Sequence, residues 1–193
     1  VLQGVGYPQP DLSHFRSIEI WDTASSSREI VQTGWLTRVA EASAVFKAAS
    51  ADGVILGTAD LGPFSGGARA VALADAQRFS AQSRLASGAE SPARGALAHI
   101  VRVENDVVRA GAELASTRPL STEFPRTPFG QAARQAAMIA ATRHVPVIRI
   151  TQSGFDTHQN QLAFQANLLR QVADGVVALR GALQEAGVWD DTV

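Results

Sequence analysis

A short β-branched run followed by a long amphipathic pattern constrains the fold more than any other feature of this chain. Residues 145–150 are rich in Val and Ile and alternate in polarity, which is typical of a buried strand. From about Asn160 to Gly187 apolar side chains recur every three or four residues, which predicts a helix of about seven turns with one face on a sheet. The residues of this face are Leu162, Ala166, Leu169, Val172, Val176, Leu179 and Leu183. Residues 190–193 resemble the start of another strand, so the order strand, helix, strand predicts a parallel sheet with a right-handed crossover.

The first helix of the chain is expected from Asp11, as its N-cap, to about residue 24. His14, Ile18 and Trp21 follow the helical spacing and would share a side that faces the core. The start of the helix would also place Ser13 and His14 beside unpaired backbone N–H groups, which is a ready anion site. A structural role for His14 is the alternative.

Further segments complete the expected α/β pattern. Residues 35–49 predict one helix, and its expected buried side chains include Leu36, Val39 and Phe46. Residues 54–56 and 71–73 predict short strands. The glycine-rich stretch 57–67 between them lacks the sequence of a P-loop or a dinucleotide-binding loop, so a plain loop is favoured over a phosphate cradle.

The middle of the chain is less distinctive. Residues 77–90 predict a surface segment, and residues 94–116 predict a helix on which His99 is a surface or packing residue. Thr127 and Pro128 supply an N-cap and a first-turn proline for a helix to about residue 143. His144 then follows at the carboxyl end of that helix, where its charge suits the helix dipole.

Composition describes an ordinary globular domain and excludes several function classes. The 193 residues are 46% hydrophobic and 18% charged, which suffices for one domain with a sizeable core. A net charge of -1 gives no general attraction to nucleic acid or to an anionic membrane surface. No apolar stretch reaches the length of a transmembrane segment. Because the chain has no cysteine, a metal would be held by imidazole and oxygen ligands.

Asp156 and His158 are the best candidates for chemistry. They follow the strand at 145–150 after a break at Gly154, and ligands of open α/β sheets bind at the carboxyl ends of the strands. A carboxylate and an imidazole two residues apart suit a divalent metal such as zinc or manganese. The alternative is that Asp156 caps the following helix and His158 is a surface residue of its first turn.

Three motifs of the chain resemble one bacterial family, the domain of unknown function 1501 family. They are Gly4-Val5-Gly6-Tyr7-Pro8 with Ser13-His14-Phe15-Arg16-Ser17 and Trp21; Gly154-Phe155-Asp156-Thr157-His158-Gln159-Asn160-Gln161; and Gly187-Val188-Trp189-Asp190-Asp191-Thr192-Val193. Members of the family are placed within the alkaline phosphatase and sulfatase superfamily. The resemblance implies a three-layer α/β fold with a mostly parallel, doubly wound sheet of the alkaline phosphatase-like type. On this basis residues 1–193 are expected to form a single but partial domain, an internal fragment that lacks N-terminal and C-terminal strands.

The resemblance also implies a function and a location. Superfamily members bind one or two divalent metals at the carboxyl ends of their strands and cleave phosphate or sulfate esters. Asp156 and His158 match their Asp and His ligands, although the spacing is shorter than the Asp-x-x-x-His common there. Ser13 and His14 lie where members place a nucleophile at a helix start. Family members carry a twin-arginine export signal, which implies a periplasmic or cell-surface protein.

Two functions are therefore expected. The first is a metal-dependent hydrolase of phosphate or sulfate esters, with zinc, manganese or calcium as cofactor and a small-molecule or glycan ester as substrate. The second is an exported, non-catalytic module that binds a glycan or protein partner on the same fold. A Ser-His-Asp esterase is disfavoured because the chain has no Gly-x-Ser-x-Gly motif.

Overall fold

The fold is a small parallel sheet between helices. The computed structural model describes residues 4–49, 51–73 and 120–193, so the predictions for residues 77–90 and 94–116, with His99, lie outside the described residues. The strands β1 (Gly53–Leu56), β2 (Ala70–Leu73) and β3 (Ile148–Ile150) form a sheet of order β2-β1-β3. Both neighbours run parallel to β1, which confirms the predicted parallel α/β arrangement.

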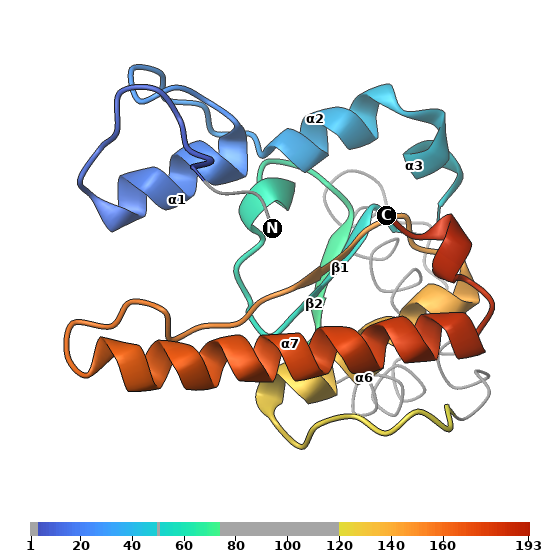
Figure 1. Ribbon diagram of the computed structural model, residues 1–193. Helices are drawn as coiled ribbons and strands as arrows, with labels where there is room; N and C mark the ends of the chain where they lie inside the picture. The colour runs from blue at the N-terminus through green and yellow to red at the C-terminus, as the bar shows by residue number, and fades with distance from the viewer. Residues whose placement is uncertain (1–3, 50, 74–119) are drawn as a thin grey trace, which may run out of the picture.

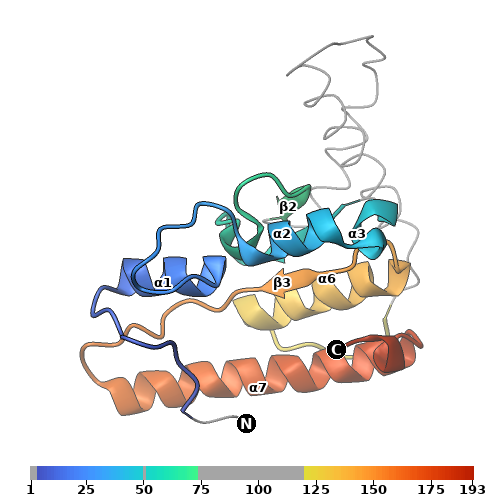
Figure 2. The same ribbon diagram turned by 90° about the horizontal axis from the view of Figure 1, so that it is seen from above.

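Helices cover both faces of this sheet (Figures 1 and 2). On one face lie α2 (Trp35–Ala42), α3 (Ala44–Ala48) and the 3-10 turn η1 (Gly62–Phe64). On the other lies α6 (Pro128–Thr142), and α7 (Gln161–Glu185) packs against it. Successive side chains of β1 point to opposite faces of the sheet and so contribute to two hydrophobic cores. Ile55 packs with Leu36 and Phe64 in one core, whereas Val54 and Leu56 pack with Ala136 and Ile139 in the other.

The helix starts follow their capping residues. Thr127 accepts a hydrogen bond from Gly130 N at 3.1 Å and Pro128 is the first helical residue, which confirms the predicted start of α6. The helix α1 (His14–Thr23) is capped by Ser13, so the prediction of Asp11 as N-cap is wrong. Asp11 Oδ1 instead accepts from Ser13 N at 2.7 Å and fixes the turn before the cap.

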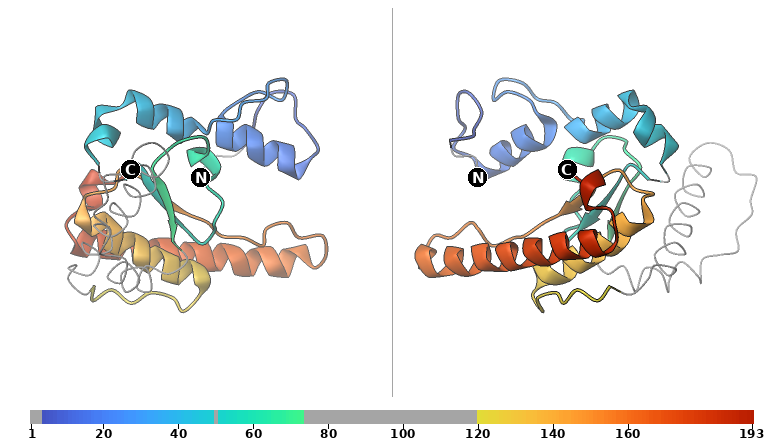
Figure 3. Two further views of the ribbon diagram at one scale, coloured as in Figure 1. Left: turned by 180° about the vertical axis from the view of Figure 1, so that it is seen from behind. Right: turned by 45° about the vertical axis from the view of Figure 1, so that its right-hand side comes forward.

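The side of α1 that faces the core is not the predicted one. Ile18 and Trp21 are each 54% exposed, and the buried residues of the helix are Ile20 and Thr23. The reason is that α1 projects beyond the end of the sheet and meets η1 only near its own carboxyl end (Figure 3). Periodicity therefore identified the helix but not the side that is buried.

The predicted helix at 35–49 is two helices. Ser43 adopts an extended conformation and separates α2 from α3. Leu36 and Phe46 are buried as predicted, whereas Val39 is 41% exposed, so its predicted burial is wrong.

The long helix α7 packs differently from the prediction. Its second half is buried at Ala178, Ala182 and Leu183, mainly against α6, but Leu162 and Leu169 in the first half are 91% and 58% exposed. The first half extends past the sheet on the same side as α1 (Figures 1 and 3), so the sheet does not cover its apolar stripe. Among the described helices none is long and apolar enough to span a membrane.

The segment after α7 is a 3-10 turn, η2 (Trp189–Asp191), and the predicted strand start at 190–193 is wrong. Two contacts hold this turn. Arg180 lies 5.3 Å above the ring of Trp189, and Arg143 Nη1 lies 2.5 Å from Asp191 Oδ2.

Candidate functional site

The carboxyl ends of β1 and β3 lie side by side and bring the predicted loop to the sheet edge. Thr151 N donates to Leu56 O at 2.9 Å, which continues the pairing beyond both strands. Gly57 follows β1 with a φ of +86°, and a Cβ at this position would lie 2.6 Å from Thr151 O. A glycine is therefore required for this close approach, after which the chain leads to Asp156 and His158.

Asp156 and His158 belong to the loop before α7 and not to the helix. The N-cap of α7 is Asn160, which has a left-handed backbone conformation and makes no side-chain capping hydrogen bond. The alternative in which Asp156 caps the helix and His158 lies in its first turn is therefore wrong. Both side chains are exposed, by 63% and 78% respectively.

The start of α1 supplies the other two predicted site residues. Ser13 Oγ accepts a hydrogen bond from Arg16 N at 3.4 Å, so this side chain caps the helix. The hydroxyl hydrogen is not used in that bond. His14 is the first residue of the helix, and its side chain is 68% exposed.

The structure brings His14, Asp156 and His158 together from two distant parts of the chain. His14 Nε2 lies 3.4 Å from Asp156 Oδ1, and His158 Nδ1 lies 3.5 Å from the same oxygen. The two imidazole rings are stacked, with centroids 6.5 Å apart and planes at 23°. One carboxylate oxygen is thus flanked by an imidazole from α1 and an imidazole from its own loop.

This cluster meets part of the geometry of a metal site. In a tetrahedral zinc site, ligand atoms about 2.1 Å from the metal are about 3.4 Å from one another. The two imidazole-to-carboxylate distances match that edge, but stacked rings do not aim both imidazoles at a common point. Accordingly, no group of three or more His, Cys, Asp or Glu side chains in the described ranges is arranged to hold a metal ion. A metal held by all three side chains would therefore require one of the two exposed imidazoles to adopt another rotamer.

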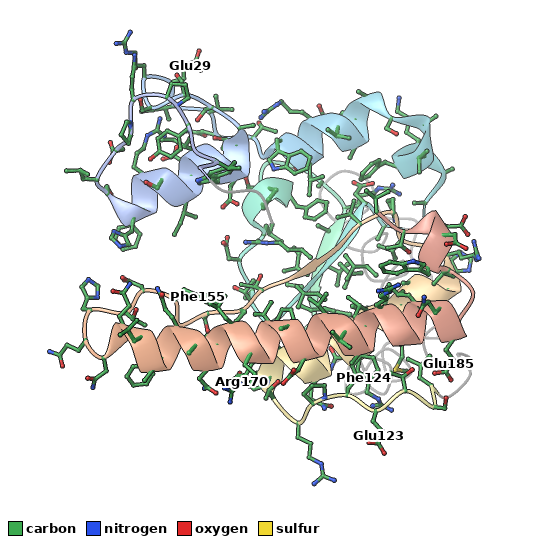
Figure 4. All side chains as sticks on the ribbon, in the orientation of Figure 1. Glu29, Glu123, Phe124, Phe155, Arg170 and Glu185 are labelled. Carbon is green, nitrogen blue, oxygen red and sulfur yellow. The ribbon has the colours of Figure 1, made fainter. Side chains whose placement is uncertain are left out.

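Two threonine hydroxyls on the segment that continues β3 were not predicted from the sequence. Thr151 Oγ1 and Thr157 Oγ1 are buried and have no hydrogen-bond partner among the described residues. Thr157 directly follows Asp156, and Thr157 N donates to Phe155 O at 2.9 Å in a tight turn. Phe155 lies on the side of α7 that faces α1 (Figure 4). The sequence could not identify these two threonines, because whether a threonine hydroxyl has a hydrogen-bond partner depends on the tertiary structure.

A shallow, largely open depression lies along the first turns of α7, beginning two residues after His158. Its lining combines side-chain amides with apolar groups, from Asn160, Gln161, Leu162, Ala163, Phe164 and Asn167. Amides orient polar ligand groups and Phe164 offers an apolar ring face, as is usual for sites that bind small molecules.

A comparison with known protein families agrees with the family resemblance that the sequence motifs indicated. A family model described as Protein of unknown function (DUF1501) matches residues 2–193. No curated protein and no solved structure matches the chain.

Proposed function

The chain belongs to the DUF1501 family, and we propose that it is a metal-dependent hydrolase of phosphate or sulfate esters whose metal is held by His14, Asp156 and His158. The observation that carries this proposal is the pair of contacts, at 3.4 and 3.5 Å, between two imidazoles and one carboxylate oxygen. Two nitrogens and one carboxylate suit zinc or manganese better than calcium, which prefers oxygen ligands alone.

The chemistry follows from this ligand set and from the start of α1. A divalent metal would polarise an ester oxygen and lower the pKa of a bound water to about 7. The N–H groups of His14 and Phe15, in the first turn of α1, have no intrahelical acceptor and can hydrogen bond to the anionic oxygens of the ester. Two nucleophiles fit this arrangement: the Ser13 hydroxyl, which lies beside His14 in the chain, or a water molecule.

The depression at the start of α7 supports the expected substrate class. Asn160, Gln161 and Asn167 offer both donors and acceptors, as a small-molecule or glycan ester would require, and Phe164 is 56% exposed for ring stacking. The proposal places the cleaved group at the metal cluster and the organic part of the ester in this depression. From the family resemblance we also propose that the protein acts in the periplasm or at the cell surface of a bacterium.

A second candidate is a non-catalytic module that binds a glycan or protein partner. One observation favours it: large apolar side chains beside the cluster are almost fully exposed, namely Leu12 at 96%, Phe15 at 87% and Leu162 at 91%. Exposed apolar groups next to polar ones are common at protein interaction sites. The module would need neither metal nor ester hydrolysis, so both can be measured to separate the two functions.

The test is a zinc and manganese titration by calorimetry of the full-length protein and four variants. His14→Ala, Asp156→Asn and His158→Ala should each weaken binding by at least about tenfold, because each removes one ligand. His144→Ala is the matched control, since His144 lies at the carboxyl end of α6 and outside the cluster, and it should bind as the wild type does.

Hydrolysis completes the test. The metal-loaded protein is assayed with p-nitrophenyl phosphate and p-nitrophenyl sulfate, and Ser13→Ala distinguishes the two nucleophiles. If the three cluster variants bind metal as tightly as the wild type, the cluster is not the metal site. If metal binds but neither ester is cleaved, the binding module is preferred.

A further inference from the structure

The residues of the cluster come from two separate parts of the structure. His14 belongs to residues 4–33, which comprise α1 and the loops before and after it, and we call this part the α1 arm. Asp156 and His158 belong to the loop that continues β3. The cluster therefore forms only when the α1 arm has the correct orientation relative to the sheet.

The α1 arm is tied together internally. Arg16 Nη2 donates to Ser26 O at 3.1 Å and also to the carbonyl of Glu29, so α1 holds the loop that follows it. Tyr7 OH and Ser17 Oγ share a hydrogen bond of 2.7 Å, which holds the preceding loop. These bonds make a rotation of the whole arm easier than a rearrangement within it.

The helix α2, which follows the arm, is fixed to the structure beside the sheet. Gly34 N and Thr37 Oγ1 both donate to Ser65 O, at 3.0 and 2.9 Å. Thr37 is 1% exposed, and a Cβ on Gly34 would lie only 2.0 Å from Pro63 O. This close backbone contact leaves the start of α2 little freedom to move.

Arg38 connects this fixed helix with the α1 arm. Its Nη2 donates to Thr23 O, the carbonyl of the last residue of α1, at 2.6 Å. Its Nη1 donates to Thr33 O at 2.5 Å. One guanidinium thus holds both ends of the link at residues 24–33, and its planar shape allows it to serve both carbonyls at once.

We infer that Arg38 is a positioning residue for the cluster of His14, Asp156 and His158. Its two hydrogen bonds set the direction of α1 at the carboxyl end of the helix, and that direction decides where His14 lies at the opposite end. Buried Ile20 gives the same end of α1 an apolar anchor. The Thr23 hydroxyl bonds within the arm, to Glu19 O and Ser25 Oγ, so among the described residues neither side chain makes a directional bond to α2. This inference depends on the proposed function only for the identity of the ligand that the cluster binds.

The absence of cysteine from the chain allows a direct test of position. In the variant His14→Cys with His158→Cys, a short bismaleimide reagent should link the two thiols, because the rings that they replace are 6.5 Å apart between centroids. Adding Arg38→Gln should slow this cross-linking by about tenfold, which is the effect expected from losing hydrogen bonds of a charged donor. Arg38→Lys, which can serve one carbonyl at a time, should give an intermediate rate. Arg170→Gln makes the same charge change on the exposed side of α7 (Figure 4) and should have no effect.

A second cysteine pair separates position from overall stability. Ser121→Cys with Glu185→Cys lies away from the arm, at a contact of 2.6 Å between Ser121 N and Glu185 Oε1. Arg38→Gln should leave the cross-linking rate of this second pair unchanged. If both pairs slow equally, or if the first pair is unaffected, Arg38 does not position His14 and the inference is overturned.

A zinc titration distinguishes this inference from the proposed function. Arg38→Gln should weaken zinc binding about tenfold when His14 is present, and should have no further effect in the His14→Ala variant. If the wild type binds no zinc, the proposed function fails, while the cross-linking rates still decide the role of Arg38. If Arg38→Gln weakens zinc binding equally in both backgrounds, Arg38 acts without His14 and the inference is overturned.

Discussion

Glu185, near the end of α7, holds the chain at Thr122. The Oε2 atom of Glu185 accepts from both Thr122 N and Thr122 Oγ1, at 3.0 and 2.8 Å, while Oε1 accepts from Ser121 N at 2.6 Å. Ser121 and Thr122 precede α6 in the chain, and Figure 4 shows Glu185 on the side of α7 that faces this segment, which includes Glu123 and Phe124. Donation by two backbone N–H groups and a hydroxyl stabilises the carboxylate and lowers the pKa of Glu185 to about 2.

The first prediction is that Glu185→Gln lowers the melting temperature at pH 7, by roughly 2 to 4 °C. The folded-state pKa is lowered from 4.5, so this stabilisation is complete above pH 4.5 and is lost as the pH falls towards 2. The difference between wild type and variant should shrink over that range. Glu123→Gln, a nearby exposed charge, is the control. A difference that persists unchanged at pH 2 would show that the carboxylate charge is not the cause.

The second prediction concerns Asp22, on the side of α1 towards the sheet. Burial raises the pKa of Asp22, the charge of Arg149 acts in the opposite direction, and Asp60 adds to the rise. With a raised folded-state pKa, the contribution to stability is greatest below pH 3.8 and is lost as the pH rises through the folded-state value. Asp22→Asn should therefore melt at or above the wild-type temperature at pH 7.

The measurement is thermal unfolding from pH 3 to pH 8, with Asp190→Asn, at an exposed position in η2, as the control. The advantage of Asp22→Asn should disappear at the acidic end of this range. If the variant melts well below the wild type at pH 7, attraction to Arg149 outweighs the cost of burial.

Local sequence signals predicted the sheet and the best-defined helix start. The apolar residues of β1 are buried on both faces of the sheet, and Ile148 and Ile150 of β3 are half-buried against one of its two cores. Such short apolar runs are visible in a few neighbouring residues of the sequence. Thr127 and Pro128 act within one turn of α6, so the same applies to them. The family was also predicted, from motifs at both ends of the chain, and the family match confirms it.

The wrong predictions share a physical cause. An apolar stripe shows that one side of a helix avoids water, but not which element covers it, and so Ile18 of α1 and Leu162 of α7 were expected to be buried. The proximity of His14 to Asp156 has no local signature, because it depends on how α1 is held against α2. For the same reason the sequence suggested Asp156 and His158 as a pair and His14 as a separate candidate beside Ser13, but not that the three side chains lie together.

The third prediction concerns the ion pair at the entrance to β1 and β2. Asp52 is 6% exposed, and its carboxylate accepts from Arg69 N at 2.7 Å and from Arg69 Nη2 at 2.6 Å. Asp52→Ala should lower the free energy of unfolding by about 2 to 3 kcal/mol, since it removes the ion pair and leaves the backbone N–H of Arg69 without its acceptor. This expected loss is at the low end of the range for breaking a buried ion pair, because the Arg69 side chain is 40% exposed.

Chemical denaturation measures this change, and Asp174→Asn on the exposed side of α7 serves as the control. The control should change the free energy of unfolding by less than about 0.5 kcal/mol. An equally small effect of Asp52→Ala would mean that water replaces the carboxylate in satisfying Arg69.

The last prediction compares two glycines of α7 that differ in what faces them. A Cβ on Gly175 would lie 2.5 Å from the ring of Phe129 in α6, whereas a Cβ on Gly181 would meet only the side chain of Thr122, at 3.7 Å or more. Gly175→Ala should therefore destabilise the protein by about 1 to 3 kcal/mol, because the helices must separate to accept the methyl group. Gly181→Ala should instead stabilise it by roughly 0.5 to 1 kcal/mol through helix propensity. Denaturant midpoints of the two variants measure the difference, and equal midpoints would mean that α6 and α7 are not packed as closely as Phe129 and Gly175 require.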